Sequence, residues 1–182
     1  MKIGLMTTDH TWLSGNLDYL DASAFSGLYV VDHPQFPILS PWTFLAYVAA
    51  RTSRIRLGTH VTGVPFHHPQ SLAKQVATVD ILSGGRAVLG LGTGYEHEDF
   101  EPYGYEMLPF SGRAGMLEET IQILKSFWTQ ATTEFSGQHY QLKGGAAFEP
   151  KPVQQPHPPI FVGFNTNGLL MKIAARLADG FN

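Results

Sequence analysis

The sequence predicts an α/β protein built around a parallel sheet, and three observations lead to this fold class. Six short apolar runs recur along the chain, each without a polar face, as strands buried on both sides require. Between them lie longer segments with the 3.6-residue period of amphipathic helices. The two kinds of segment alternate, which implies right-handed crossovers between parallel strands. An open doubly wound sheet and a TIM barrel both satisfy these observations.

The boundaries of the expected elements follow from prolines, glycines and the ends of the apolar runs. Strands are expected at Lys2–Met6, Gly27–Val31, Arg56–Val61, Arg86–Leu91, Pro159–Val162 and from Gly180 onward. Helices are expected at Leu17–Ala22, Pro41–Ala50 (after the N-cap Ser40), Pro69–Ser83, along the apolar face Leu117–Trp128, and at Thr166–Ala178. A small hairpin is expected at Phe135–Tyr140, inside a less regular stretch whose length is typical of functional excursions.

Composition excludes several classes of protein. The 182 residues suffice for one domain with a sizeable core, and the net charge of −3, with 12 scattered basic residues, gives no footprint for nucleic acid. No apolar run approaches the roughly 18 residues that cross a bilayer, and the first residues do not form a secretory signal. The absence of cysteine excludes disulfides and thiolate metal sites. We expect a cytoplasmic protein that binds neither nucleic acid nor membranes.

The candidate site lies at the carboxyl ends of the expected strands, where parallel α/β proteins bind ligands. The residues there are polar, aromatic or glycine, without lysine or arginine: Thr7–His10, Asp32-His33, His60–Thr62, Gly92–Tyr95 and Gly163–Asn165. Such a set suits a planar, partly polar ligand. The loop Gly90–Gly94 (GLGTG) is similar to a dinucleotide fingerprint, but Tyr95 occupies the position of its last glycine and the loop follows the fourth strand. A tight turn explains the same glycines.

Three groups of titratable residues are candidates for chemistry. Asp32-His33 is a candidate catalytic pair, because a carboxylate beside an imidazole at a ligand-binding strand end can orient and charge the ring; a structural histidine is the alternative. His67-His68 has no third ligand at suitable spacing, so a loop or helix-start role is expected and no metal site. The acidic segment Glu96–Asp99 is interpreted as the start of a helix. Neither a serine-nucleophile elbow nor a P-loop motif occurs.

A series of long motifs stands in register along the chain from Leu28 onward. They are Thr52–Val64 (TSRIRLGTHVTGV), His67–Pro69, Leu72–Lys74, Asp80–Arg86 (DILSGGR), Gly90–Gly104 (GLGTGYEHEDFEPYG), Arg113 with Leu117–Glu119, Lys151–Gly163 (KPVQQPHPPIFVG) and Arg176–Asn182 (RLADGFN). Together these motifs resemble the luciferase-like monooxygenase family. The resemblance is strongest to the branch whose members are usually assigned the deazaflavin coenzyme F420.

The resemblance implies a TIM (β/α)8 barrel and a site for coenzyme F420, with FMN as the alternative cofactor. Asp32 and His33 match the pair beside the reactive face of the isoalloxazine-type ring, with His33 as a candidate proton donor or acceptor. His60 and Val61 match a bulge after the third strand, often a non-proline cis peptide, that presses against the back of the ring.

The resemblance also implies contacts along the rest of the cofactor. Gly92, Thr93, Gly94 and Tyr95 match the loop that lies along it. After the fifth strand the family has two glycines near the tail of the cofactor; the first is matched by Gly163, and Phe164 replaces the second.

The chain departs from the family pattern in length. A complete barrel takes about 250 residues and eight strands, whereas this sequence reaches only the sixth strand. We therefore expect a single incomplete barrel domain over residues 1–182, without the seventh and eighth strands. A fragment, a truncated gene product and a homodimer that completes the core by pairing two copies are three alternatives.

The expected function is that of a flavin- or deazaflavin-dependent oxidoreductase that carries out hydride or oxygen transfer on a small organic substrate. The alternative is a catalytically inactive relative that binds the cofactor or acts as a dimeric interaction protein.

Overall fold

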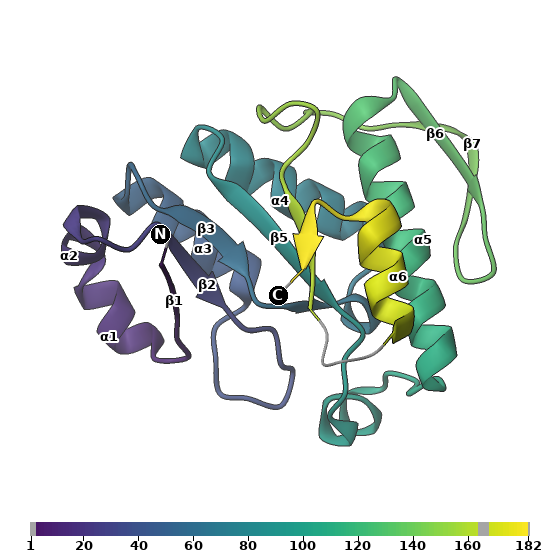
Figure 1. Ribbon diagram of the computed structural model, residues 1–182, viewed down its shortest axis with the longest axis horizontal. Coiled ribbons are helices and arrows are strands. Elements are labelled where there is room, and N and C mark those ends of the chain that lie inside the picture. Colours follow the sequence, from purple (N-terminus) through teal and green to yellow (C-terminus); the bar gives the residue numbers. More distant parts are fainter. Residues whose placement is uncertain (1–2, 164–167, 182) are drawn as a thin grey trace.

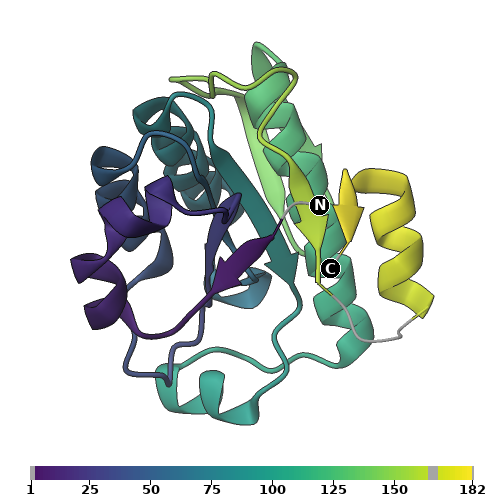
Figure 2. The same cartoon turned by 60° about the vertical axis from the view of Figure 1, so that its left-hand side comes forward.

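The expected parallel sheet is present in the computed structural model, which describes residues 3–163 and 168–181 (Figure 1). Six strands, each parallel to its neighbour, stand in the order β1 (Gly4–Met6), β2 (Gly27–Val30), β3 (Arg56–Thr59), β5 (Ala87–Gly92), β8 (Ile160–Val162) and β9 (Gly180–Phe181). A further short strand, β4 (Thr62–Gly63), also pairs with β5. The sheet curls as part of a barrel does (Figure 2), so the fold is part of a TIM-type barrel rather than an open doubly wound sheet.

Helices follow the strands along the chain: α1 (His10–Gly15), α2 (Leu17–Ala22), α3 (Pro41–Arg51), α4 (Pro69–Ser83), α5 (Phe110–Thr129) and α6 (Gly168–Leu177). The predicted starts at Pro41 and Pro69 are confirmed, and α4 ends where Gly84 takes a φ of +67°. Where one short helix was predicted there are two, because Asp9 accepts a hydrogen bond from Trp12 N at 2.8 Å and caps a first turn.

The predicted hairpin between α5 and β8 is confirmed, and its two strands extend beyond the predicted range Phe135–Tyr140. It consists of β6 (Thr132–Ser136) and β7 (Gln141–Ala147). The carboxylate of Glu119 on α5 accepts hydrogen bonds from the backbone N–H groups of the turn, Gln138, His139 and Tyr140. The hairpin is therefore tied to α5, away from the strand ends (Figure 1).

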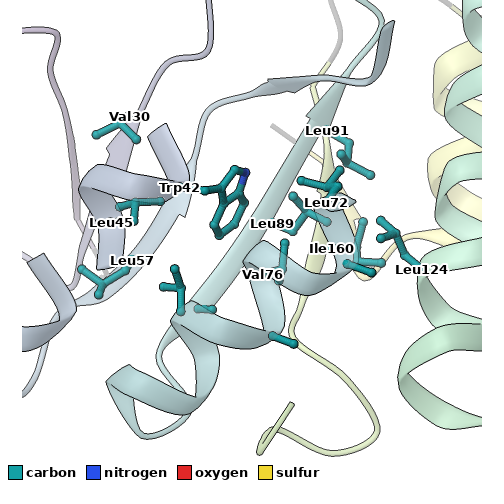
Figure 3. Close-up of a cluster of buried hydrophobic side chains, with 14 of the residues drawn as sticks. Val30, Trp42, Leu45, Leu57, Leu72, Val76, Leu89, Leu91, Leu124 and Ile160 are labelled. Atoms are coloured by element: carbon teal, nitrogen blue, oxygen red, sulfur yellow. The ribbon is translucent and has the colours of Figure 1, made fainter. Parts of the chain in front are cut away.

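The core lies between the sheet and helices α3, α4 and α5 (Figure 3). Strand side chains on the face toward the helices are fully buried, among them Leu57, Leu89, Leu91 and Ile160. They meet helix side chains that are also fully buried, among them Leu45, Leu72, Val76 and Leu124. Burial of apolar surface stabilises the fold by about 25 cal/mol per Å², so this layer holds the strands and hence their carboxyl ends in place.

A buried carboxylate and a partly buried guanidinium hold the amino-terminal side of β5 in place. Asp80, fully buried, accepts hydrogen bonds from Val153 N at 2.8 Å and from Gln154 N at 3.0 Å. The guanidinium of Arg86 donates to the carbonyl oxygens of Ala49 and Thr52 at the end of α3, at 3.1 and 2.7 Å. Desolvation by burial lowers the pKa of Arg86, and the charge of Asp21 opposes this effect.

Asp21 holds the turn that leads into β3. Its carboxylate accepts hydrogen bonds from the backbone N–H groups of Ser53 (2.7 Å), Arg54 (2.9 Å) and Ile55 (3.1 Å), and from the Ser53 hydroxyl. Partial burial alone would raise the pKa of Asp21, but these hydrogen bonds outweigh it and lower the pKa from 3.8 to about 2. Because the folded-state pKa is the lower one, the carboxylate stabilises the fold above the unfolded value, and this effect is lost as pH falls toward 2.

Asp21→Asn is expected to lower the free energy of unfolding by about 1 kcal/mol at neutral pH, a figure reduced for the partial exposure of the group. The difference from the wild type should shrink as pH falls from about 4 to about 2. Urea unfolding at a series of pH values measures both. Asp18→Asn, at an exposed position of α2, should stay within about 0.5 kcal/mol of the wild type. A difference between wild type and Asp21→Asn that does not change with pH would contradict the assignment.

Candidate functional site

The carboxyl ends of β2, β3 and β5 lie at one edge of the sheet, and the loops that follow them contact one another there. The ring of His33, after β2, lies 5.8 Å from the ring of Tyr95, after β5, centroid to centroid. The backbone N–H of His60, directly after β3, donates to Val30 O at 2.8 Å. Residues that were predicted for the site on three strands thus come together.

β3 is interrupted after Thr59, where the His60–Val61 peptide is cis, as the resemblance implied. Buried hydrogen bonds hold the residues on either side of this bulge. Trp42 Nε1 donates to Thr62 Oγ1 at 3.1 Å, and Thr62 Oγ1 donates to Thr59 Oγ1 at 2.9 Å. Thr59 Oγ1 in turn donates to Gly90 O at 2.9 Å. The bulge is therefore locked to both α3 and β5.

His33 is oriented by a carboxylate far away in the sequence. Its Nδ1 lies 2.6 Å from Oδ2 of Asp99, a residue that is only 1% exposed. The other oxygen of Asp99 accepts a hydrogen bond from Gln35 N at 3.2 Å. Phe36 stacks on the His33 ring, with centroids 4.5 Å apart and an interplanar angle of 25°. The imidazole is thus held by the loop after β5 and by its own loop.

The interpretation that Asp32 orients its neighbour His33 is wrong. Oδ2 of Asp32 accepts a hydrogen bond from Gly63 N at 3.2 Å and lies 2.7 Å from Nε2 of His67. The two adjacent residues therefore belong to different pairs, Asp32 with His67 near β4 and His33 with Asp99 near β5. We refer to these as the crossed pairs.

Two other expectations are settled by the same contacts. His67-His68 does have the predicted loop and helix-start role, since His67 pairs with Asp32 and the Nδ1 of His68 accepts a hydrogen bond from Gln70 N at 3.2 Å at the start of α4. Glu96–Asp99 does not open an α-helix. It contains a short 3-10 turn instead, η2 (His97–Asp99), which Glu96 precedes. Asp99 is buried and pairs with His33. No local pattern in the sequence reveals this pairing.

The loop after β5 has the close packing that its glycines permit. A Cβ atom on Gly92 would lie 2.5 Å from Cγ2 of Val61, so β5 lies tightly against the bulge. Thr93 is buried, and Gly94 has a φ of +68°. Tyr95 is 68% exposed at the site edge. Partial desolvation, then the carboxylates of Glu96 and Asp99, raise the pKa of Tyr95, so its phenol remains a hydrogen-bond donor at neutral pH.

The last predicted contacts follow β8. Gly163 N donates to Leu91 O at 2.8 Å, which places Gly163 beside the end of β5. Phe164, the second residue predicted for the tail of the cofactor, lies outside the described residues.

His10, at the end of the loop after β1, is an additional buried imidazole at this edge. Its ring packs edge-on against Phe44, with centroids 4.7 Å apart. Neither ring nitrogen has a hydrogen-bond partner within the part of the chain that the structure describes. Desolvation lowers the pKa of His10 and the nearby Asp9 opposes this, so the ring is expected to be neutral at pH 7.

Residues 3–163 and 168–181 contain no group of three or more His, Asp or Glu side chains placed to hold a metal ion. Within the same residues, no helix combines the length and the apolar character needed to span a lipid bilayer.

The chain is therefore part of an α/β barrel, and its candidate residues lie at the carboxyl edge of the parallel sheet. The chain belongs to the luciferase-like monooxygenase family, whose sequence model matches residues 17–182.

Individual relatives agree with this assignment. An uncharacterised protein of Mycobacterium tuberculosis is 38% identical over 143 residues, which cover 79% of this chain and 49% of the relative. An F420-dependent glucose-6-phosphate dehydrogenase of Amycolatopsis mediterranei is 32% identical over 146 residues, 78% of this chain and 42% of that enzyme. The solved structure of a coenzyme F420-dependent tetrahydromethanopterin reductase from Methanopyrus kandleri superposes with a TM-score of 0.81 at 25% identity, over 100% of this chain and 54% of that one. The chain spans about half the length of the curated relatives it matches.

Proposed function

We propose that the chain forms the ring-binding part of the site of a cytoplasmic, deazaflavin-dependent oxidoreductase that acts on a small organic substrate, with FMN as the alternative cofactor. The observation that carries the proposal is that the bulge after β3, whose Val61 packs against Gly92, lies at the same edge as the oriented imidazole of His33. Family membership and a dehydrogenase relative named for F420 support it.

The side chains at the edge fit a flavin-type ring. Deazaflavin and flavin rings are flat, with polar groups along one side, and they need a surface without bulky or charged side chains across their faces. Gly92 and Gly94 supply such a surface, and the residues that follow the strands include no lysine or arginine. A phosphate-bearing tail would need cationic or helix-terminal partners, so we assign only the ring to this part of the protein.

Each residue has a distinct proposed role. When bound, the ring supplies a carbon or nitrogen centre that exchanges hydride with a substrate. Val61 supports the ring from behind, because its side chain is wedged against Gly92. His33 carries a proton to or from the substrate, and its distance of 2.6 Å to Asp99 keeps the imidazole in one orientation. Tyr95 lies exposed at the rim, where its phenol is hydrogen-bonded to Glu96.

The purified chain is expected to bind F420 or FMN with a dissociation constant in the micromolar range or tighter, which corresponds to about −8 kcal/mol. Titration followed by cofactor fluorescence measures this for both cofactors, and the tighter one identifies the cofactor. Bovine serum albumin at the same concentration controls for non-specific quenching. Absence of binding of both cofactors, by this chain and by any longer product of the same gene, would contradict the proposal.

The alternative, a cofactor-binding or dimeric protein without turnover, is favoured by one observation. Within the described residues, the outer strand β1 pairs on one side only, with β2, and it carries an exposed apolar side chain, Met6 (56%). An open edge of this kind is a surface for a second copy. Light scattering that gives the mass of a dimer, together with bound cofactor and no turnover on alcohols or aldehydes, would favour this alternative.

A further inference from the structure

We infer that Asp99 is the positioning residue of His33 and fixes its tautomer, with the proton on Nδ1 and an unprotonated Nε2 at the site. Only the use of Nε2 in a reaction rests on the proposed function; the tautomer itself does not. Asp32, the neighbour of His33 in the sequence, is assigned no part in it.

The argument starts from the chemistry of the contact. His33 Nδ1 and Asp99 Oδ2 are 2.6 Å apart, within hydrogen-bonding distance. An ionised carboxylate only accepts hydrogen bonds, so the proton between the two atoms belongs to Nδ1. In a neutral imidazole the second nitrogen then has no proton, and Nε2 is an acceptor. Among the described residues, Asp99 is the hydrogen-bond partner of this ring.

The carboxylate is itself fixed, which makes it suitable for positioning. Asp99 is 1% exposed, and its Oδ1 accepts a hydrogen bond from Gln35 N, two residues beyond His33. One carboxylate therefore joins the imidazole and the backbone of the same loop. Phe36 on the ring face and Tyr95 at 5.8 Å restrict rotation of the imidazole further.

Asp32 does not take this role in the structure, because its Oδ2 pairs with other residues and His33 pairs with Asp99. Its Oδ2 is shared by Gly63 N and His67 Nε2, at 3.2 and 2.7 Å. The crossed pairs therefore provide a matched control within one protein. Asp99 and Asp32 each belong to a histidine–carboxylate pair, and only Asp99 is predicted to fix the tautomer of His33.

Replacement of Asp99 by asparagine has a specific expected effect. The backbone N–H of Gln35 requires an acceptor, and the only oxygen of the new amide can supply it. The amide NH2 then faces His33 and donates to Nδ1. A neutral ring must respond by carrying its proton on Nε2. Asp99→Asn is thus expected to invert the tautomer while it preserves the size and shape of the side chain.

The test is a two-bond ¹H–¹⁵N correlation spectrum of the ¹⁵N-histidine-labelled chain, at about pH 9, where an ordinary histidine with a pKa of about 6.5 is neutral. The chain has 8 histidines, and the signal that disappears in His33→Gln identifies His33. We expect the pattern of an Nδ1–H ring in the wild type and in Asp32→Asn, and that of an Nε2–H ring in Asp99→Asn.

Each outcome decides the inference. An Nε2–H pattern for the signal that His33→Gln identifies in the wild type overturns it, even if neither Asp99→Asn nor Asp32→Asn folds. An unchanged pattern in folded Asp99→Asn, or an inverted one in folded Asp32→Asn, also overturns it. Since the spectrum is recorded without cofactor, failure to bind F420 or FMN would overturn the proposed function and leave the tautomer assignment standing.

Discussion

Gly90→Ala is expected to lower the free energy of unfolding by about 3 kcal/mol, an effect at the upper end of those caused by overpacking a core. A Cβ atom on Gly90 would lie 2.2 Å from the backbone oxygen of Thr59 and 3.2 Å from its carbonyl carbon. Backbone in the neighbouring strand cannot rotate away as a side chain can. The strands would have to separate where Thr59 Oγ1 donates to Gly90 O, which removes that hydrogen bond as well.

Chemical unfolding in urea, followed by far-ultraviolet circular dichroism, measures this loss. Gly15→Ala is the matched control, because a Cβ atom there meets nothing within 4 Å, and it should leave stability unchanged or raise it by about 0.5 kcal/mol. A Gly90→Ala protein as stable as the Gly15→Ala protein would show that β3 and β5 are not packed as described.

Gly92→Ala is expected to weaken cofactor binding more than it destabilises the fold. The new Cβ atom would meet Cγ2 of Val61 at 2.5 Å, and that contact is with a side chain at the site edge. Val61 can yield by moving toward the space that we assign to the ring. We expect a loss of at least about tenfold in cofactor affinity, equivalent to about 1.4 kcal/mol, with a smaller loss of stability than Gly90→Ala causes.

The same fluorescence titration measures the affinity, and Gly15→Ala again serves as the control with unchanged binding. Wild-type affinity in the Gly92→Ala protein would mean that Val61 and Gly92 do not lie against the ring. Gly90→Ala and Gly92→Ala thus distinguish an effect on the packing of the sheet from an effect on cofactor binding.

The strands and long helices could be predicted from the sequence because their signals are local. Apolar runs of four to six residues mark buried strands, and prolines at 41 and 69 mark helix starts. The predicted strand Arg56–Val61 was too long, since the strand ends at Thr59 and resumes as β4 after the cis peptide. The bulge itself came from the family resemblance, because no local pattern specifies a cis bond that tertiary contacts such as Trp42 with Thr62 surround.

The sequence could predict that the candidate residues lie at one edge of the sheet, but not how they pair. Strand order brings Asp32, His33, His60 and the glycine loop to that edge, and their role in a site stays a prediction. Which carboxylate meets which imidazole depends on side-chain directions across loops. Asp99 is 66 positions from His33, and His67 is 35 positions from Asp32. Proximity in the sequence favoured the Asp32–His33 pair, and the loop geometry selected the crossed pairs instead.

The crossed pairs also separate the positions of the loop after β2 that must be kept in protein engineering from those that can be varied. Asp32 is bound to Gly63 and His67, whereas His33 and Gln35 are both bound to Asp99, so an insertion or deletion among these positions would exchange or break partners. Beyond these anchors, Phe36 (41%) and Leu39 (53%) are exposed. Libraries that vary length and sequence at 37–39 are therefore expected to change the exposed part of this loop and to leave the contact between His33 and Asp99 in place.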